Sequence, residues 1–300
     1  MNRTRPHIWR LHLRPDHDAQ SDPVALCLSE GIVGIGWRVE GCPATKQQYL
    51  QMAEKRYGNI SWRRAANAFV NRIELDDLVW TRDFAGMYYL GKVDGEWMYN
   101  DGDCYRSADI VNIRKASLFR IGSSVAGKIV ACFRPSATIQ EIDDETVRLF
   151  SMIIYNRSSQ TEYFEVQKSS ATTNIFSLLS DVDLEDVVGL YLQSELNYLL
   201  IPSTRSRDNN TPFVEFYLIS RLNGNIAGVQ VKSGSYKINR DHYAGIEQQM
   251  YLFSPAGYSG IERENTTSLE RDVIEAFMTS RRDLMPLSVK TWLSYSEGLQ

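Results

Sequence analysis

Two short segments in the C-terminal half of the chain carry polar side chains in otherwise apolar surroundings. Residues 228–234 read GVQVKSG, and this alternating run between glycines predicts a β-strand with Gln230 and Lys232 on one face. Residues 213–219 read FVEFYLI and predict a second strand whose single charged residue is Glu215. Polar groups among apolar neighbours cost free energy unless they have partners or a function. We therefore expect the acid, the amide and the lysine to form a functional site together.

The elements that would position these residues follow a definite order. They are a helix, a strand, a strand, a turn, a strand, a helix and a strand, predicted over residues 181–193, 198–201, 213–219, 223–225, 228–234, 240–250 and 249–254. This order resembles the core of the PD-(D/E)xK nucleases, and Gln230-Val-Lys232 is similar to the QxK element of the Mrr-like branch. The sequence departs from the family in having Glu215 where aspartate is usual, and it lacks a proline–acid dipeptide.

This resemblance implies an α/β domain with a mixed central sheet and a nuclease that requires Mg²⁺ or Mn²⁺. The metal would neutralise developing charge and activate water, and one or two carboxylates suffice because Mg²⁺ keeps several of its waters. Glu215 would be the chief ligand, and Lys232 would polarise the water or stabilise the phosphorane. The further ligands would be the Gln230 amide oxygen, the Val231 carbonyl oxygen and Glu185. Because Gln230 carries no charge, we expect one weakly held ion.

Each of these residues also has a structural explanation. Glu185 suits the first turn of a helix, where negative charge is favourable, and Glu215 could belong to a purely structural ion pair. Residues 181–300 contain 11 basic and 16 acidic residues, so their net charge of −5 argues against DNA binding through a general positive field. DNA contacts would then depend on a local patch that contains Arg205 and Arg207. The charge and the glutamate at the strand position favour an alternative, a catalytically inactive nuclease-like domain that binds or regulates.

Length and composition predict two domains. Three hundred residues with 43% hydrophobic content can form two cores, and we expect domains over 1–157 and 181–300 with a Ser/Thr/Gln-rich junction over 158–180. The four cysteines form no CxxC motif, and no apolar secretory segment begins the chain. We therefore expect free thiols in a cytoplasmic protein. The apolar runs are too short to span a membrane.

The first of these domains contains five of the six tryptophans. Flat aromatic faces beside polar edge groups are what a pocket for a nucleobase requires. The tryptophans and glycines lie in predicted strand segments at residues 9–10, 31–37, 76–80, 89–93 and 110–114. In this order the segments resemble the EVE and PUA-like domains of prokaryotic restriction and defence proteins.

That resemblance implies an α+β domain, a small β-barrel with flanking helices, that holds a modified or flipped base. Trp37 and Trp80 would line its pocket, Trp9 is the third candidate, and Arg114 could bind the base or a phosphate. Together the two resemblances imply a restriction or antiviral-defence endonuclease that recognises modified DNA or a nucleotide-like ligand. A nuclease gated by a nucleotide second messenger is a further alternative. Enzymes that cut both strands are commonly dimeric, so a homodimer is expected.

Overall fold

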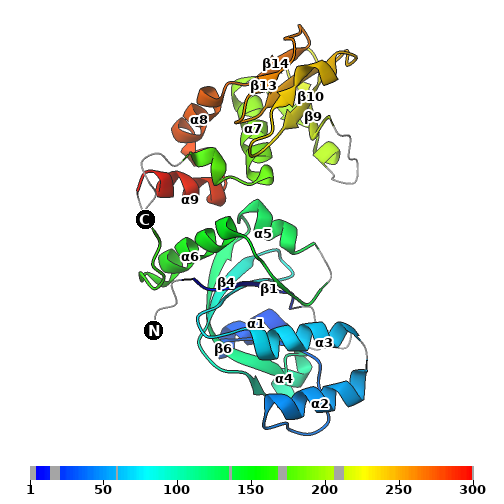
Figure 1. Ribbon diagram of the computed structural model, residues 1–300, viewed down its shortest axis with the longest axis vertical. Helices are drawn as coiled ribbons and strands as arrows, with labels where there is room; N and C mark the ends of the chain where they lie inside the picture. Colours follow the sequence, from blue (N-terminus) through cyan, green and yellow to red (C-terminus); the bar gives the residue numbers. More distant parts are fainter. Residues whose placement is uncertain are drawn as a thin grey trace. The chain divides into compact units, whose positions relative to one another are not determined.

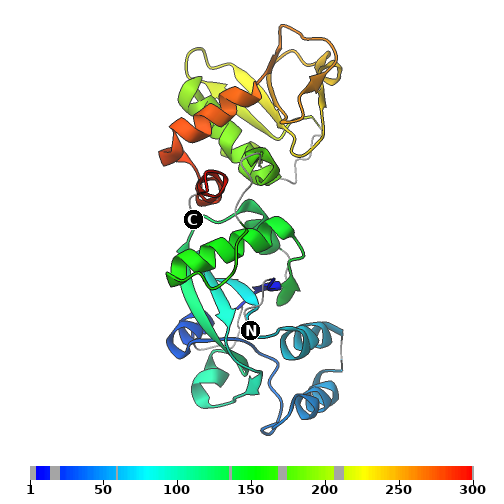
Figure 2. The same ribbon diagram turned by 60° about the vertical axis from the view of Figure 1, so that its left-hand side comes forward.

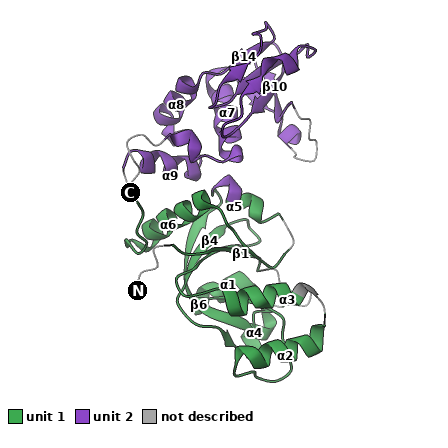
Figure 3. Cartoon of the chain, in the orientation of Figure 1, with its two compact units in different colours: residues 1–125, 129–167 green, residues 126–128, 168–300 purple. Residues whose placement is uncertain are grey.

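In the computed structural model the chain forms two compact units, residues 1–125 with 129–167 and residues 126–128 with 168–300 (Figure 3). The structure describes residues 5–13, 21–58, 60–134, 137–167, 174–205 and 213–298. Both units combine helices and sheets, which confirms the expected mixture of α and β structure. The change of unit after residue 167 falls within the segment 158–180 that the composition indicates as a junction.

The first unit is organised around a seven-stranded sheet with the order β2-β6-β4-β3-β1-β7, in which β5 also pairs with β6 (Figure 1). The strands are β1 Ile8–Leu11, β2 Ile32–Ile35, β3 Leu78–Arg82, β4 Tyr88–Val93, β5 Met98–Tyr99, β6 Asn112–Gly122 and β7 Ile139–Glu141. Strand β6 pairs with β2 through residues 112–115 and with β4 through residues 116–122. One long strand therefore belongs to both parts of the sheet and makes it curl.

Six α-helices accompany this sheet in the described residues. They are α1 Pro23–Glu30, α2 Lys46–Tyr57, α3 Ile60–Ala66, α4 Asp103–Ser107, α5 Gly127–Cys132 and α6 Glu145–Ser159, and α3 continues as a π-helix over Asn67–Arg72. Local signals explain where the longer helices begin. The side chains of Thr45 and Asp144 accept hydrogen bonds from free backbone N–H groups in the first turns of α2 and α6.

The second unit contains a five-stranded mixed sheet with the order β14-β12-β10-β9-β8. Its strands are β8 Tyr198–Leu200, β9 Phe216–Ser220, β10 Ile226–Val231, β12 Gln249–Phe253 and β14 Thr266–Ser268. Neighbours are antiparallel from β8 to β10 and parallel from β10 to β14. The short strands β11 Ile238–Asn239 and β13 Tyr258–Ser259 form a separate parallel pair.

Helices lie on one side of this sheet (Figures 1 and 2): α7 Asp181–Glu195, α8 Arg271–Ser280 and α9 Leu287–Ser296. Helix α7 begins with a capping box, in which the N-cap Ser180 and Asp183 at the third helical position satisfy each other's backbone N–H groups. The buried Asp183 also accepts a 2.6 Å hydrogen bond from Ser288 on α9. Phe216 on β9 packs against α7, where its ring would lie at an ordinary contact distance of 3.6 Å from a Cβ at Gly189.

The helix predicted over 240–250 is wrong. The chain forms β11, a 3-10 turn at Arg240–Tyr243 and then β12. Asn239 fixes the turn, because its side chain accepts a hydrogen bond from Asp241 N at 3.0 Å. Tyr243 is buried against Met250 and Leu252, so tertiary burial overrides the local helical pattern.

All four cysteines are free, and their environments differ. Burial raises the pKa of Cys27 to about 12, whereas Cys42 and Cys104 are exposed. Because the thiolate is the reactive form, we expect iodoacetamide at mildly alkaline pH to alkylate Cys42 and Cys104 in the native protein and to spare Cys27. Peptide mass spectrometry measures this, with the denatured protein as the control in which Cys27 also reacts. Early labelling of native Cys27 would contradict its burial.

A search of the described residues for membrane spans finds no helix with the length and apolar character to cross a bilayer.

Candidate functional site

Three side chains of the second unit meet at one carboxylate oxygen. Lys232 Nζ lies 3.1 Å and Gln230 Nε2 lies 2.5 Å from the same Oε1 atom of Glu215. The sequence separates Glu215 from Gln230 by a whole hairpin, so the sheet brings them together. This is the cluster that the alternating segments predict, and we call these three residues the carboxylate cluster.

Strand pairing explains why the cluster forms. Strands β9 and β10 are antiparallel, and Phe216 is opposite Val229. Glu215 precedes β9, and its N–H donates to the Val229 carbonyl at 2.8 Å, which sets Glu215 beside Gln230. Lys232 follows the end of β10, where its N–H donates to Phe253 O on β12 at 2.9 Å. Each member therefore has a fixed backbone.

The cluster lies on the sheet face that the helices do not cover. Phe216 points to α7, and successive side chains of a strand point to opposite faces, so Glu215 and Gln230 point away from that helix. Tyr243, from the 3-10 turn, covers this second face. Burial and, to a smaller extent, the negative charge of Glu215 together raise the pKa of Tyr243 to about 12. Tyr243 is a neighbour of the cluster that the sequence pattern does not identify.

The members of the cluster differ in exposure. Gln230 is only 1% exposed, whereas 30% of the Glu215 side chain and 42% of the Lys232 side chain are exposed. Solvent and solutes can therefore reach the charged pair. The buried Gln230 Oε1 atom has no hydrogen-bond partner in the described part of the chain. A buried amide oxygen without a partner is costly, and it is one that a bound cation would satisfy.

Glu185, the other carboxylate predicted for the metal site, lies on α7, and its Oε2 atom is 3.8 Å from Arg205 Nη2. The same guanidinium nitrogen is 2.7 Å from Asp186 Oδ1. Burial raises the pKa of Asp186, and the positive charge of Arg205 opposes that rise. Glu185 therefore pairs with Arg205, and its role as a metal ligand beside Glu215 stays a prediction. The predicted DNA contact Arg207 lies outside the described residues.

The donor set at the cluster fits a single hard cation. Within the described ranges, no group of three or more His, Cys, Asp or Glu side chains is arranged to hold a metal ion. One carboxylate, one amide oxygen and main-chain carbonyls remain, and these oxygen ligands suit Mg²⁺ or Mn²⁺ that retains waters. Because Lys232 already pairs with Glu215, a metal has to compete with an ammonium group for that carboxylate.

A separate cavity of 340 Å³ lies in the first unit, and Trp37 lines it as predicted. Tyr57 is a second aromatic wall, with ring centroids 5.3 Å apart in an edge-to-face arrangement. Asp109 and His12 supply polar lining. Trp37 and Asp109 have φ angles of 65° and 50°, a left-handed conformation that non-glycine residues seldom adopt and that is found at functional sites.

Glycine at position 36 lets the Asp109 carboxylate lie directly against the backbone in this cavity. A Cβ atom there would lie 2.4 Å from a carboxylate oxygen of Asp109, which is closer than real contacts allow. Tyr49 and Tyr57 hold the neighbouring backbone, since their hydroxyls donate to the carbonyls of Trp37 and Arg38. The aromatic wall and the carboxylate therefore have fixed positions.

Two of the predicted pocket tryptophans belong to the core instead. Trp80 is fully buried, stacks on Phe150 with centroids 6.3 Å apart and donates from Nε1 to Ser151 Oγ at 2.8 Å. Trp9 is 1% exposed and donates from Nε1 to Asp77 Oδ2 at 3.0 Å. The expectation that Trp9 and Trp80 line a ligand pocket is corrected, because each fills the interior and has its polar atom satisfied.

Arg114 also has a structural role in place of the expected ligand contact. Its guanidinium is 1% exposed and donates to Phe69 O and Val70 O at 3.1 and 3.0 Å, and to Gly95 O at 3.3 Å. Phe69 and Val70 lie in the π-helix, whose irregular hydrogen bonding leaves carbonyls to be satisfied. Arg114 therefore joins β6 to the π-helix, and its burial separates it from any base or phosphate in solution.

Known proteins give no guide to either site. No family model matches the chain, no curated protein matches it, and no solved structure matches it.

Proposed function

We propose that the second unit is a phosphodiester hydrolase, a Mg²⁺- or Mn²⁺-dependent DNA endonuclease of restriction or antiviral-defence type. The observation that carries the proposal is the convergence of Glu215, Gln230 and Lys232 on one carboxylate oxygen. The sheet supports it, because β8, β9 and β10 are antiparallel and β12 adds a parallel strand after them, as the resemblance to PD-(D/E)xK nucleases implies. The capped helix α7 precedes these strands.

The metal would be held by the Glu215 carboxylate, the Gln230 amide oxygen and the Val231 carbonyl oxygen. When bound, it would neutralise charge on the phosphate and activate a water. Gln230 now donates from Nε2 to Glu215 and to Val231 O. A half-turn of the amide would present the Gln230 Oε1 atom to the ion. This buried oxygen, which has no hydrogen-bond partner among the described residues, would then be satisfied by the metal.

The roles of the other side chains follow from their positions. The Lys232 ammonium, freed from Glu215, would donate hydrogen bonds to the phosphate oxygens on which negative charge develops. Burial holds the stem of Gln230 in place, so that only its terminal amide has to turn when the metal binds. Tyr243 remains a neutral phenol at physiological pH, since its pKa is raised to about 12, and it covers the cluster without adding charge.

A second candidate function follows from the single carboxylate. A cluster with one acid and an ion pair can be a structural feature of a nuclease-like domain that binds DNA or a partner without cutting. The two functions differ in one measurable property, divalent-metal-dependent cleavage.

Cleavage of supercoiled plasmid DNA tests the proposal. Wild-type protein with Mg²⁺ or Mn²⁺ should convert plasmid carrying modified bases to nicked or linear forms, and EDTA should prevent this. The Glu215→Gln variant keeps the size and loses the charge, so it should be inactive with either metal. Equal cleavage by wild type and Glu215→Gln would reject the assignment, and no cleavage by wild type on modified or unmodified DNA would favour the binding function.

We further propose that the first unit is a PUA-like or EVE-like domain that recognises a modified base or a nucleotide-like ligand in the cavity beside Trp37. A flat ring could stack on Trp37 or Tyr57 while its polar edge meets Asp109. Because cutting both strands needs two active sites, we propose that the enzyme acts as a homodimer.

The Trp37→Ala variant should bind a modified nucleoside about 5- to 150-fold more weakly than wild type, because stacking on an aromatic ring contributes about 1–3 kcal/mol per base. Isothermal titration with a series of modified nucleosides and nucleotides measures this. Phe84→Ala is the matched control, since Phe84 is 73% exposed and does not line the cavity. Unchanged affinity in Trp37→Ala would remove this cavity from the proposal.

A further inference from the structure

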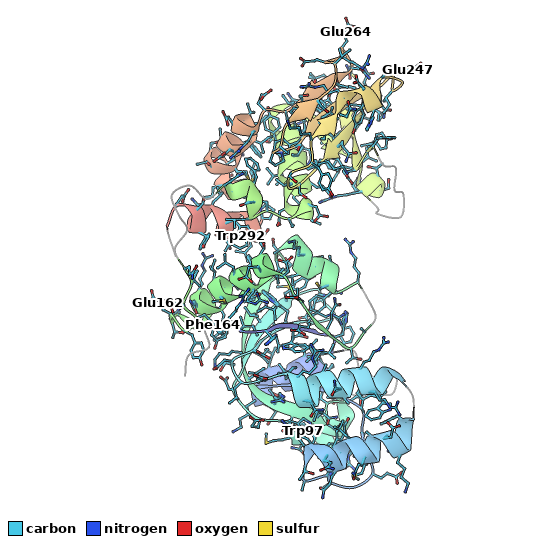
Figure 4. All side chains as sticks on the ribbon, viewed as in Figure 1. Trp97, Glu162, Phe164, Glu247, Glu264 and Trp292 are labelled. Atoms are coloured by element: carbon cyan, nitrogen blue, oxygen red, sulfur yellow. The ribbon has the colours of Figure 1, made fainter. Side chains whose placement is uncertain are left out.

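A second cavity, of 690 Å³, lies in the second unit. Its lining includes Val214 and Tyr217 from the β9 side, Asn225 and Ile226 at the start of β10, and Glu247 and Gln248 just before β12. Figure 4 shows Glu247 at the opposite end of this unit from Trp292 on α9, so the cavity is remote from the α9 end. None of the roles assigned above uses this cavity.

The cavity adjoins the carboxylate cluster on the same sheet face. Tyr217 pairs with Gly228, and these residues are two positions from Glu215 and Gln230, so all four share a face. Gln248 Nε2 lies 3.4 Å from where a Gly228 Cβ would be. The missing side chain of Gly228 makes room for Met250, whose Sδ would lie 2.5 Å from that Cβ, and the Gln248 amide lies beside the same position. Two residues of a strand span about 6.6 Å, so the amide lies about one nucleotide from the cluster.

The chemistry of the lining fits the edge of a nucleobase and does not fit a phosphate. None of the described residues that line the cavity is a lysine or an arginine, and Glu247 would repel an anion. Asn225 and Gln248 offer amide donors and acceptors, and neither side chain makes a hydrogen bond within the described part of the chain. By contrast, Gln249 donates to Met250 O and Thr267 Oγ1. Tyr217, Ile226 and Ile246 provide apolar walls for a flat ring.

We infer that this cavity binds the base of the nucleotide next to the phosphate held at the carboxylate cluster, and that it prefers bases with an exocyclic amino group over thymine. The Glu247 carboxylate can only accept hydrogen bonds, and adenine, cytosine and guanine each carry an exocyclic amino group that donates, whereas thymine does not. The Gln248 amide can pair with an adjacent donor and acceptor on the same base edge. The inference rests on the proposed nuclease function, because it takes the cluster as the site of the phosphate.

Binding of single-stranded homopolymers to the full-length protein tests the inference. Fluorescence anisotropy with labelled oligo-dA, oligo-dC and oligo-dT is measured in EDTA so that no strand is cut. Wild type should bind oligo-dA and oligo-dC about tenfold more tightly than oligo-dT, the discrimination expected of one bidentate base contact. Gln248→Leu should remove this preference, and Glu247→Gln should reduce it. Gln51→Leu, at an exposed glutamine of the first unit, is the matched control and should keep it.

Each outcome separates the inference from the proposed function. A base bound in the first unit contributes equally to the affinities of wild type and of variants of the second unit. Differences in affinity between these proteins therefore report on this cavity. Equal affinity of wild type for the three oligonucleotides, or an unchanged preference in Gln248→Leu, would overturn the inference even if the plasmid is cut. A lost preference in the variant alongside an uncut plasmid would support the base site and reject the nuclease. If Gln248→Leu does not fold, Asn225→Ala in the exposed hairpin serves as the second variant.

Discussion

Replacing Lys232 by methionine is expected to slow metal-dependent DNA cleavage by a factor of about 100–1000, the usual effect of removing one donor that stabilises developing charge. The Lys232 side chain is half-exposed, and its main interaction is the ion pair between its ammonium and Glu215, not packing in the core. Methionine keeps a similar length and removes the charge, so folding should be nearly unaffected. The loss should therefore appear in the maximal rate of cleavage under saturating DNA, measured by the disappearance of supercoiled plasmid.

The neighbouring lysine provides the control. Lys237 is exposed and lies five positions along the same chain, so Lys237→Met removes one positive charge from the unit without touching the carboxylate cluster. If both variants lose activity alike, the effect is a general loss of attraction for DNA and not catalysis. Metal dependence gives a second readout. Lys232→Met should require less Mg²⁺ for half-maximal occupancy of the site, because the ammonium no longer competes for Glu215.

Replacing Arg114 by methionine should destabilise the first unit by about 3–5 kcal/mol. The substitution removes a buried cation that satisfies three main-chain carbonyls, those of Phe69, Val70 and Gly95. Each carbonyl would then remain buried without this donor. A change of this size is a large part of the stability of a domain. By comparison, a base-binding role for Arg114 would predict weaker ligand binding and unchanged stability.

Urea denaturation followed by tryptophan fluorescence measures this effect. Five of the six tryptophans lie in the first unit, so the fluorescence transition reports mainly on its unfolding. The midpoint should fall by more than about 1 M urea, given the usual dependence of unfolding free energy on denaturant. Lys115→Met, at an exposed cation on the same strand, should leave the midpoint nearly unchanged. Equal midpoints for wild type and Arg114→Met would contradict the role assigned to the guanidinium.

The sequence predicts best where short-range patterns decide the outcome. The alternation of residues 228–234 puts Gln230 and Lys232 on one strand face, and the structure brings both to Glu215. The helix predicted over 181–193 likewise begins at Asp181, because capping, here by Ser180, is a local interaction. In each case the backbone geometry of a few consecutive residues determines which groups can meet.

Residues whose roles depend on distant packing could not be predicted in the same way. Trp37 and Trp80 both follow apolar strand residues, yet one lines a cavity and the other stacks on Phe150 of α6. Which face of α7 meets the sheet decides the role of Glu185, and the helical pattern alone does not specify this. Tyr243 reaches the cluster only because a predicted helix is replaced by a turn. Long-range burial, which a local pattern does not contain, decides all of these positions.

The hydrogen bonds by which Arg114 on β6 holds the π-helix have a consequence for ligand affinity. The π-helix that it holds continues α3, whose Trp62 ring packs against Tyr57, with centroids 6.4 Å apart. Tyr57 is a wall of the cavity beside Trp37. A continuous path of packed groups thus runs from the centre of the sheet to the cavity wall. The wall is preorganised, so an entering ring loses little conformational entropy in ordering it, and more of the stacking energy remains for affinity.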